Sequence, residues 1–142
     1  MEKMDCISFI GDITTREKNK FIKERMEKFS GLFVAFPIPE EIRNQARHAV
    51  EKVRNNPDAK GNAHLICQSI ISITNHGLDY IYIYPLELAN VGMLGKNTIR
   101  IGVNTAKKGI TIAVNQIIGA MHGEKLSIMA DFLESIIHEF SS

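Results

Sequence analysis

Apolar positions along this 142-residue chain recur mostly at intervals of three and four, which places them on one face of an α-helix. The C-terminal segment, with Glu124 near its start, shows the pattern most clearly. Its apolar positions are Leu126, Met129, Ala130, Leu133, Ile136, Ile137 and Phe140. Residues 40–55 repeat the pattern directly after Pro39. Their apolar positions are Ile42, Ala46, Ala49, Val50 and Val53. Both segments are predicted to be amphipathic helices.

Two further helices are predicted from their end signals. Residues 14–30 begin with a capping-box pair, Thr14 and Glu17, and are followed by Gly31. The next run, "LFVAFPIP", contains two prolines and is predicted to be an extended connector packed against the core. After "NNPD", Asp58 is expected to cap a helix over residues 59–76, with Gly77 as its exit.

The stretch "DYIYIYPLEL", residues 79–88, fits two structures. Tyrosine and isoleucine alternate as in a strand. Tyr80 and Tyr84 are also one helical turn apart and continue the apolar series of the preceding helix. We therefore predict a kinked or restarted helix that ends before Pro85, followed by a glycine-bearing loop over residues 89–97.

Residues 98–115 are also open to two interpretations. As a β-hairpin, "TAKKG" would be the turn between two strands with isoleucine and valine at alternate positions. As a helix over residues 97–121, the segment has apolar residues at alternating steps of four and three. These residues are Ile99, Val103, Ala106, Ile110, Ala113, Ile117 and Ala120. The longer match favours the helix, and an α+β fold with a hairpin at 98–115 remains the alternative.

Together these elements predict a mainly α fold, a small bundle of about five helices with a proline-interrupted connector. The length suits one domain over residues 1–142, with a loosely ordered tail at residues 1–12. Charge divides the chain unevenly. Residues 1–60 hold 12 of the 17 Lys/Arg and 10 of the 16 Asp/Glu, whereas residues 61–123 hold six charged side chains in all. Residues 61–123 are therefore the charge-poor half of the chain.

Charge and composition also restrict location and partners. The formal net charge of +1 gives no basic footprint for nucleic acid, and none is expected. The uncharged run "GNAHLICQSIISITNHGL" contains too many polar residues for a transmembrane span. The chain has two cysteines and no signal-peptide pattern at its start, which favours a cytoplasmic location.

The sequence contains no recognisable catalytic motif. His64 and Cys67 are one helical turn apart, but a cysteine in an apolar helix is more often a buried side chain than a nucleophile. Asp131, Glu134 and His138 share one helix face and have metal-ligand chemistry, but a solvated helix face is the more usual reason for such a set. We predict no catalytic residue, no cofactor and no metal ion.

The charge-poor half instead suggests a non-catalytic protein that binds an apolar partner. The partner would be a second copy of the chain, another protein, or a lipid surface. The predicted contact residues are Tyr80, Tyr84, Ile99, Val103, Ala106, Ile110, Ala113 and Ile117. The alternative is a small enzyme or ligand-binding module whose pocket is lined by these tyrosines or Tyr82 and by His64 or His76.

Overall fold

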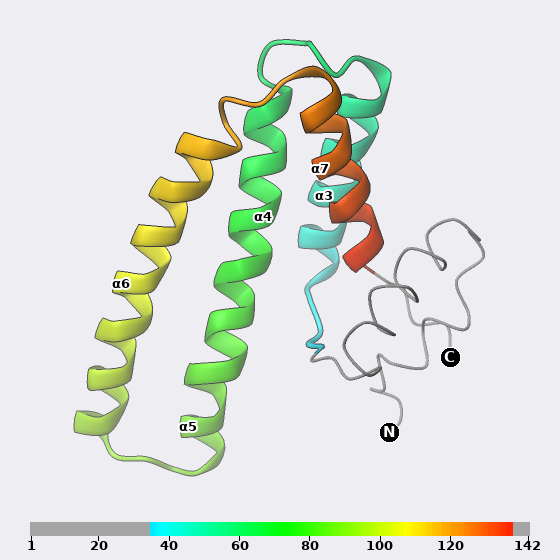
Figure 1. Ribbon diagram of the computed structural model, residues 1–142. Coiled ribbons are helices and arrows are strands. Elements are labelled where there is room, and N and C mark those ends of the chain that lie inside the picture. Colours follow the sequence, from blue (N-terminus) through cyan, green and yellow to red (C-terminus); the bar gives the residue numbers. More distant parts are fainter. Residues whose placement is uncertain (1–34, 138–142) are drawn as a thin grey trace, which may run out of the picture.

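The computed structural model describes residues 35–137, and every regular element in that range is a helix (Figure 1). These elements are α3 (Glu40–Asn55), α4 (Asn62–Leu78), the π-helix η2 (Asp79–Ile83), α5 (Tyr84–Leu88), α6 (Met93–Ile117) and α7 (Gly123–Ile136). The mainly α prediction is confirmed, and the hairpin at 98–115 is excluded because α6 spans it. The helix expected at 14–30 and the tail at 1–12 lie outside the described residues.

The core lies between α3, α4 and α7. Helix α3 has the predicted bounds. Pro39 directly precedes its first turn, which contains Glu40 and Glu41. The fully buried large apolar side chains of the core are Val53 from α3, Ile66 from α4, and Leu126 and Leu133 from α7. Burying each contributes about 1.5–3 kcal/mol. Ile136, predicted on the buried stripe of α7, is 45% exposed because Ile137 continues the stripe instead.

Helix α4 differs from its prediction at both ends. It starts at Asn62 after Gly61, whose φ of 89° lies in the left-handed region that glycine tolerates. Asp58 is a turn residue rather than the cap. Gly77 does not end the helix, because it is buried where the Phe36 ring crosses α4. A Cβ atom at Gly77 would lie 2.6 Å from Phe36 Cζ, so glycine is present for close packing.

The tyrosine-rich segment is helical throughout. The Tyr84 N–H donates to the Asp79 carbonyl five residues back, which makes the wide turn of a π-helix. Pro85 has no N–H, and its ring would clash with the carbonyl four residues earlier in a regular α-helix. The wider turn relieves this clash, so the predicted stop before Pro85 is wrong and the helix runs on to Leu88. The loop over 89–97 is also shorter than predicted, since α6 begins at Met93.

Helices α4 and α6 run antiparallel and, with η2 and α5, form a long helical hairpin over residues 62–117, called the hairpin below (Figure 1). Lys107 Nζ lies 2.8 Å from Asp79 Oδ1, and Cys67 Sγ donates to the Val114 carbonyl at 3.6 Å. The main helix contacts of α6 are with α4 and η2, whereas α3 and α7 pack on α4 away from α6 (Figure 1). Among the described residues, helix α6 is therefore covered on one side only.

Candidate functional site

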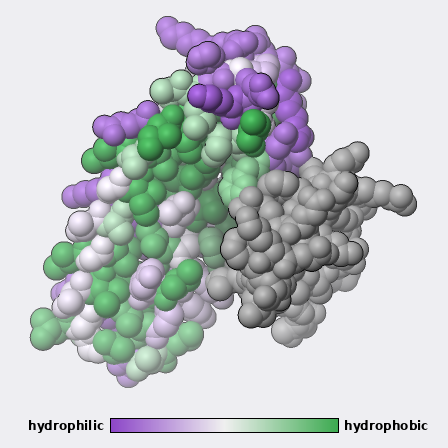
Figure 2. Space-filling view, in the orientation of Figure 1, coloured by the Kyte–Doolittle hydropathy of each residue, from purple (hydrophilic) through white to green (hydrophobic). Residues whose placement is uncertain are grey.

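Exposed apolar side chains are concentrated on the hairpin. Among the described residues, twelve large apolar side chains are exposed, and ten of them lie between residues 81 and 117. These ten, the hairpin surface, are Ile81, Tyr82, Tyr84, Leu88, Met93, Leu94, Ile99, Ile101, Ile112 and Ile117. Figure 2 shows apolar residues gathered over the hairpin, with hydrophilic residues at the opposite end of the molecule. A concentration of exposed apolar side chains on one element is typical of a binding site.

The two predicted tyrosines lie together at the α5 end of the hairpin. The Tyr80 and Tyr84 rings stack with centroids 5.6 Å apart, and the Phe36 ring stacks on Tyr80 at 6.2 Å. Phe36 also lies 6.3 Å from the His76 ring. This aromatic row fastens residues 35–39 to the hairpin. Tyr80 is half-buried within it, and Tyr84 at its end remains exposed.

The predicted stripe on α6 is divided between inside and outside. Val103 is buried and Ile110 half-buried, so these two face α4 and do not belong to an outer surface. The exposed members of the stripe within α6 are Ile99, Ala106, Ala113 and Ile117. Ala120, predicted on the same stripe, is also exposed but lies beyond the helix, which ends at Ile117 rather than at residue 121. The side of α6 that faces α4 follows Val103, Lys107, Ile110 and Val114. An α-helix turns 100° per residue, so the centre of this inward-facing side lies roughly 60° around the helix axis from the centre of the predicted stripe.

A second apolar stripe on α6, which was not predicted from the sequence, faces outward. Leu94, Ile101, Lys108 and Ile112 follow one another at steps of seven, seven and four, and we call them the outer stripe. Its three apolar members are 84%, 69% and 58% exposed. The neighbouring hydroxyls of Thr98 and Thr105 donate to helix carbonyls at 3.0 and 2.9 Å. The helix surface beside the outer stripe is therefore less polar than the two threonines suggest.

The charges on α6 are all of one sign. The helix carries Lys96, Arg100, Lys107 and Lys108 and no carboxylate. Lys107 is paired with Asp79, and Arg100 Nη2 lies 3.9 Å from Glu87 Oε2. Lys96 and Lys108 have no ion pair with another described residue. Lys96 is half-buried, so Lys108 is the one cation of α6 that is both exposed and without an ion pair to another described residue.

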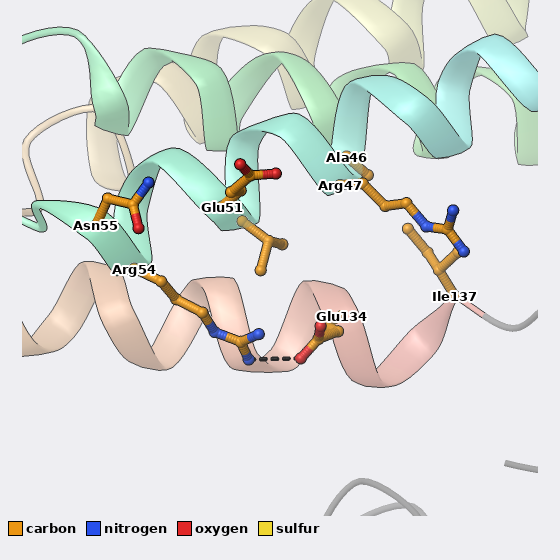
Figure 3. A pocket seen from close by; sticks show the side chains of 8 residues that line it. Ala46, Arg47, Glu51, Arg54, Asn55, Glu134 and Ile137 are labelled. Atoms are coloured by element: carbon orange, nitrogen blue, oxygen red, sulfur yellow. Dashed lines mark hydrogen bonds and ion pairs between the residues drawn. The ribbon is translucent and has the colours of Figure 1, made fainter. Parts of the chain in front are cut away.

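A pocket of about 450 Å³ lies elsewhere, between α3 and α7 (Figure 3). Its lining includes Arg47, Arg54, Glu51 and Glu134 above an apolar floor. None of the predicted tyrosines or histidines lines it. The structure therefore does not bring the Tyr/His set together around this cavity.

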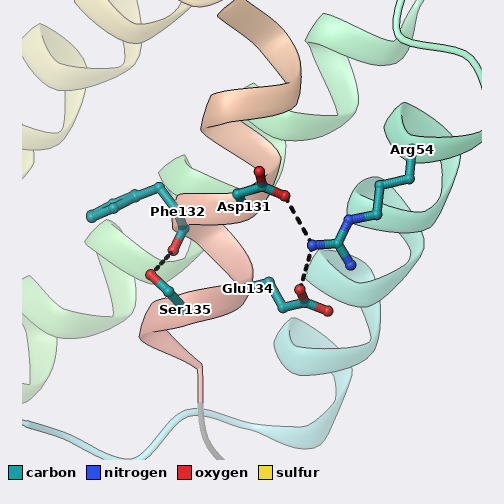
Figure 4. A network of polar contacts seen from close by, with 5 residues as sticks. All are labelled: Arg54, Asp131, Phe132, Glu134 and Ser135. Carbon is teal, nitrogen blue, oxygen red and sulfur yellow. Dashed lines mark hydrogen bonds and ion pairs between the residues drawn. The ribbon is translucent and has the colours of Figure 1, made fainter. Parts of the chain in front are cut away.

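Arg54 links α3 to α7 beside this pocket (Figure 4). Its Nη2 donates to Asp131 Oδ1 at 2.9 Å and to Glu134 Oε1 at 2.5 Å. The hydrogen bond to Glu134 is the main reason why the pKa of Arg54 is raised, although partial burial opposes it. The Arg54 guanidinium thus pairs with Asp131 and Glu134, the two carboxylates considered as metal ligands from the sequence. His138, the third ligand considered, lies outside the described residues.

Cys67 and His64 are not arranged as a nucleophile and its base. Cys67 is buried, and burial raises the pKa of its thiol, which disfavours the thiolate needed for attack. His64, one turn away, is exposed. Within residues 35–137, no group of three or more His, Cys, Asp or Glu side chains is placed to hold a metal ion.

The chain matches no protein-family model, no curated protein and no solved structure. The hairpin surface is the candidate site that the geometry itself selects.

Proposed function

We propose that this is a non-catalytic binding protein whose hairpin surface docks an apolar partner. The observation that carries the proposal is the uneven exposure of large apolar side chains, ten on the hairpin against two on α7 among the described residues. Scattered apolar residues on a surface are ordinary, but a set concentrated on one projecting element is typical of an interaction site. The other two exposed residues, Ile128 and Ile136, provide a natural control surface.

The polar chemistry of the described residues supports binding rather than catalysis. The buried thiol of Cys67 has a raised pKa, and Arg54 is held between two carboxylates. A binding surface needs neither an activated nucleophile nor a side chain that transfers protons. It needs exposed apolar area on a rigid support, which the antiparallel helices α4 and α6 provide.

The test compares two double variants of the full chain that remove equal numbers of exposed isoleucines. Ile101→Ser with Ile112→Ser alters the hairpin, and Ile128→Ser with Ile136→Ser alters α7. Light scattering after gel filtration reports self-association over a concentration series. Co-sedimentation with vesicles of mixed phosphatidylcholine and phosphatidylserine reports lipid binding. Circular dichroism checks that both variants fold.

We expect the wild-type chain to associate in at least one assay, the hairpin variant to lose that association and the α7 variant to keep it. A wild-type chain that is monomeric at every concentration and stays in the supernatant with vesicles would refute the proposal. Equal loss in both variants would also refute it, because association would then depend on general apolar exposure.

A further inference from the structure

The shape of the hairpin surface restricts what can cover it. Met93 and Leu94 are neighbours on α6 and point about 100° apart, yet both are exposed. Ile81 and Tyr82 are likewise adjacent and both exposed on the other arm. The α5 end of the hairpin is therefore apolar on several sides. A flat protein surface covers one side of such an end, whereas a fluid interface surrounds it.

The charges restrict the occupant further. Helix α6 has four cations and no carboxylate, and its two ion pairs use the carboxylates of Asp79 and Glu87 from the other arm. Lys108 lies within the outer stripe, one turn from Ile112. An α6-to-α6 contact through the outer stripe would place the exposed Lys108 against a second α6 that carries no carboxylate. An anionic occupant is therefore favoured over a second copy.

On the basis of the proposed function, we infer that the occupant is the surface of an anionic lipid bilayer. The outer stripe lies along the interface, and the α5 end enters it. Apolar side chains flanked by lysines are typical of helices that bind in the plane of a charged membrane. Tyr82 and Tyr84 suit the headgroup level, where amphipathic rings are enriched. The Lys108 stem extends along apolar surface and keeps its ammonium group among the phosphates.

The insertion is interfacial in this arrangement. No helix among the described residues is long and apolar enough to cross a bilayer. Leu94 and Ile112 are 18 residues apart, so the outer stripe extends along about 27 Å of helix. That length presents several side chains to the headgroup region at once.

The test is co-sedimentation of the full chain with vesicles of phosphatidylcholine alone and with added phosphatidylserine, at low and high salt. We expect stronger binding to the phosphatidylserine vesicles and weaker binding at high salt. Lys108→Gln should lower the partition coefficient about five-fold on anionic vesicles, because a cation near such a surface contributes about that factor. Lys125→Gln on α7 removes an exposed lysine away from the hairpin and should leave the coefficient unchanged.

A matched apolar pair separates insertion from surface attraction. Ile112 and Ile128 are both 58% exposed, one on the outer stripe and one on α7. Ile112→Ser should lower binding about ten-fold, and Ile128→Ser should not change it. Both sites are exposed, so neither substitution is expected to unfold the chain.

Three results would overturn the inference, and they differ in what they mean for the proposed function. Equal binding to neutral and anionic vesicles, lost in Ile112→Ser, would overturn the anionic partner but keep an apolar one. A dimer that Ile112→Ser dissociates, with no vesicle binding, would make the second copy the occupant and keep the docking surface. No association of any kind would overturn the inference and the proposed function together.

Discussion

Replacing Gly77 with alanine tests whether Phe36 packs against α4. Alanine in a helix interior is more favourable than glycine by about 1 kcal/mol. The new Cβ would lie 2.6 Å from Phe36 Cζ, far inside the ordinary contact distance of about 3.5–4.0 Å. Displacing a packed group costs about 1–3 kcal/mol. We therefore expect Gly77→Ala to lower the free energy of unfolding by about 0–2 kcal/mol.

The same substitution should act in the opposite direction when the ring is absent. In a Phe36→Ala background the steric cost disappears, and Gly77→Ala should stabilise by about 1 kcal/mol. Urea denaturation of the wild type, both single variants and the double variant gives a coupling energy of about 1–3 kcal/mol. If Gly77→Ala stabilises both backgrounds by the same amount, the ring does not cross α4 at Gly77 and the reasoning fails.

Three further predictions concern the core, its polar contacts and its thiol. Leu133→Ala, at a fully buried site on α7, should destabilise by about 2–5 kcal/mol in chemical denaturation, and Ile136→Ala by less than about 1 kcal/mol; similar losses would show that α7 is packed differently. Asn62 Nδ2 donates to the carbonyls of Lys52 and Asn56 at 3.1 and 2.8 Å, so Asn62→Asp removes both donors and should cost about 2–4 kcal/mol by the same assay; an unchanged midpoint would contradict these bonds. Because burial raises the pKa of Cys67, the unfolded chain releases this proton first, and the free energy of unfolding should fall as pH rises above about 8.5. Cys67→Ala should remove that part of the slope, and an identical slope in both proteins would exclude Cys67 as its source.

The elements that the sequence predicted well have one apolar face and clear end signals. Helix α3 has its predicted bounds, since Pro39 and the glutamates of its first turn mark the start. The errors occurred where tertiary contacts override local signals. Gly77 has the properties of a helix exit, but it lies inside α4, where the half-buried Phe36 ring leaves no room for a side chain. Pro85 has the properties of a stop, but a π-turn accommodates it within the helix.

The side of α6 that faces α4 was harder to predict than the helix itself, for a reason that bears on function. Apolar residues occupy both the predicted stripe and the outer stripe, so periodicity identifies a helix without identifying its buried face. Polar contacts with the other arm determine which stripe is buried. Lys107 pairs with Asp79, and the Val114 carbonyl accepts a hydrogen bond from the Cys67 thiol, only when that side of α6 faces inward. Once these contacts orient α6, Ile101 and Ile112 must point outward with Lys108 between them. A helix with more apolar faces than its own fold covers is less soluble unless a partner covers the remaining face, and the exposed Lys108 within the outer stripe favours an anionic partner.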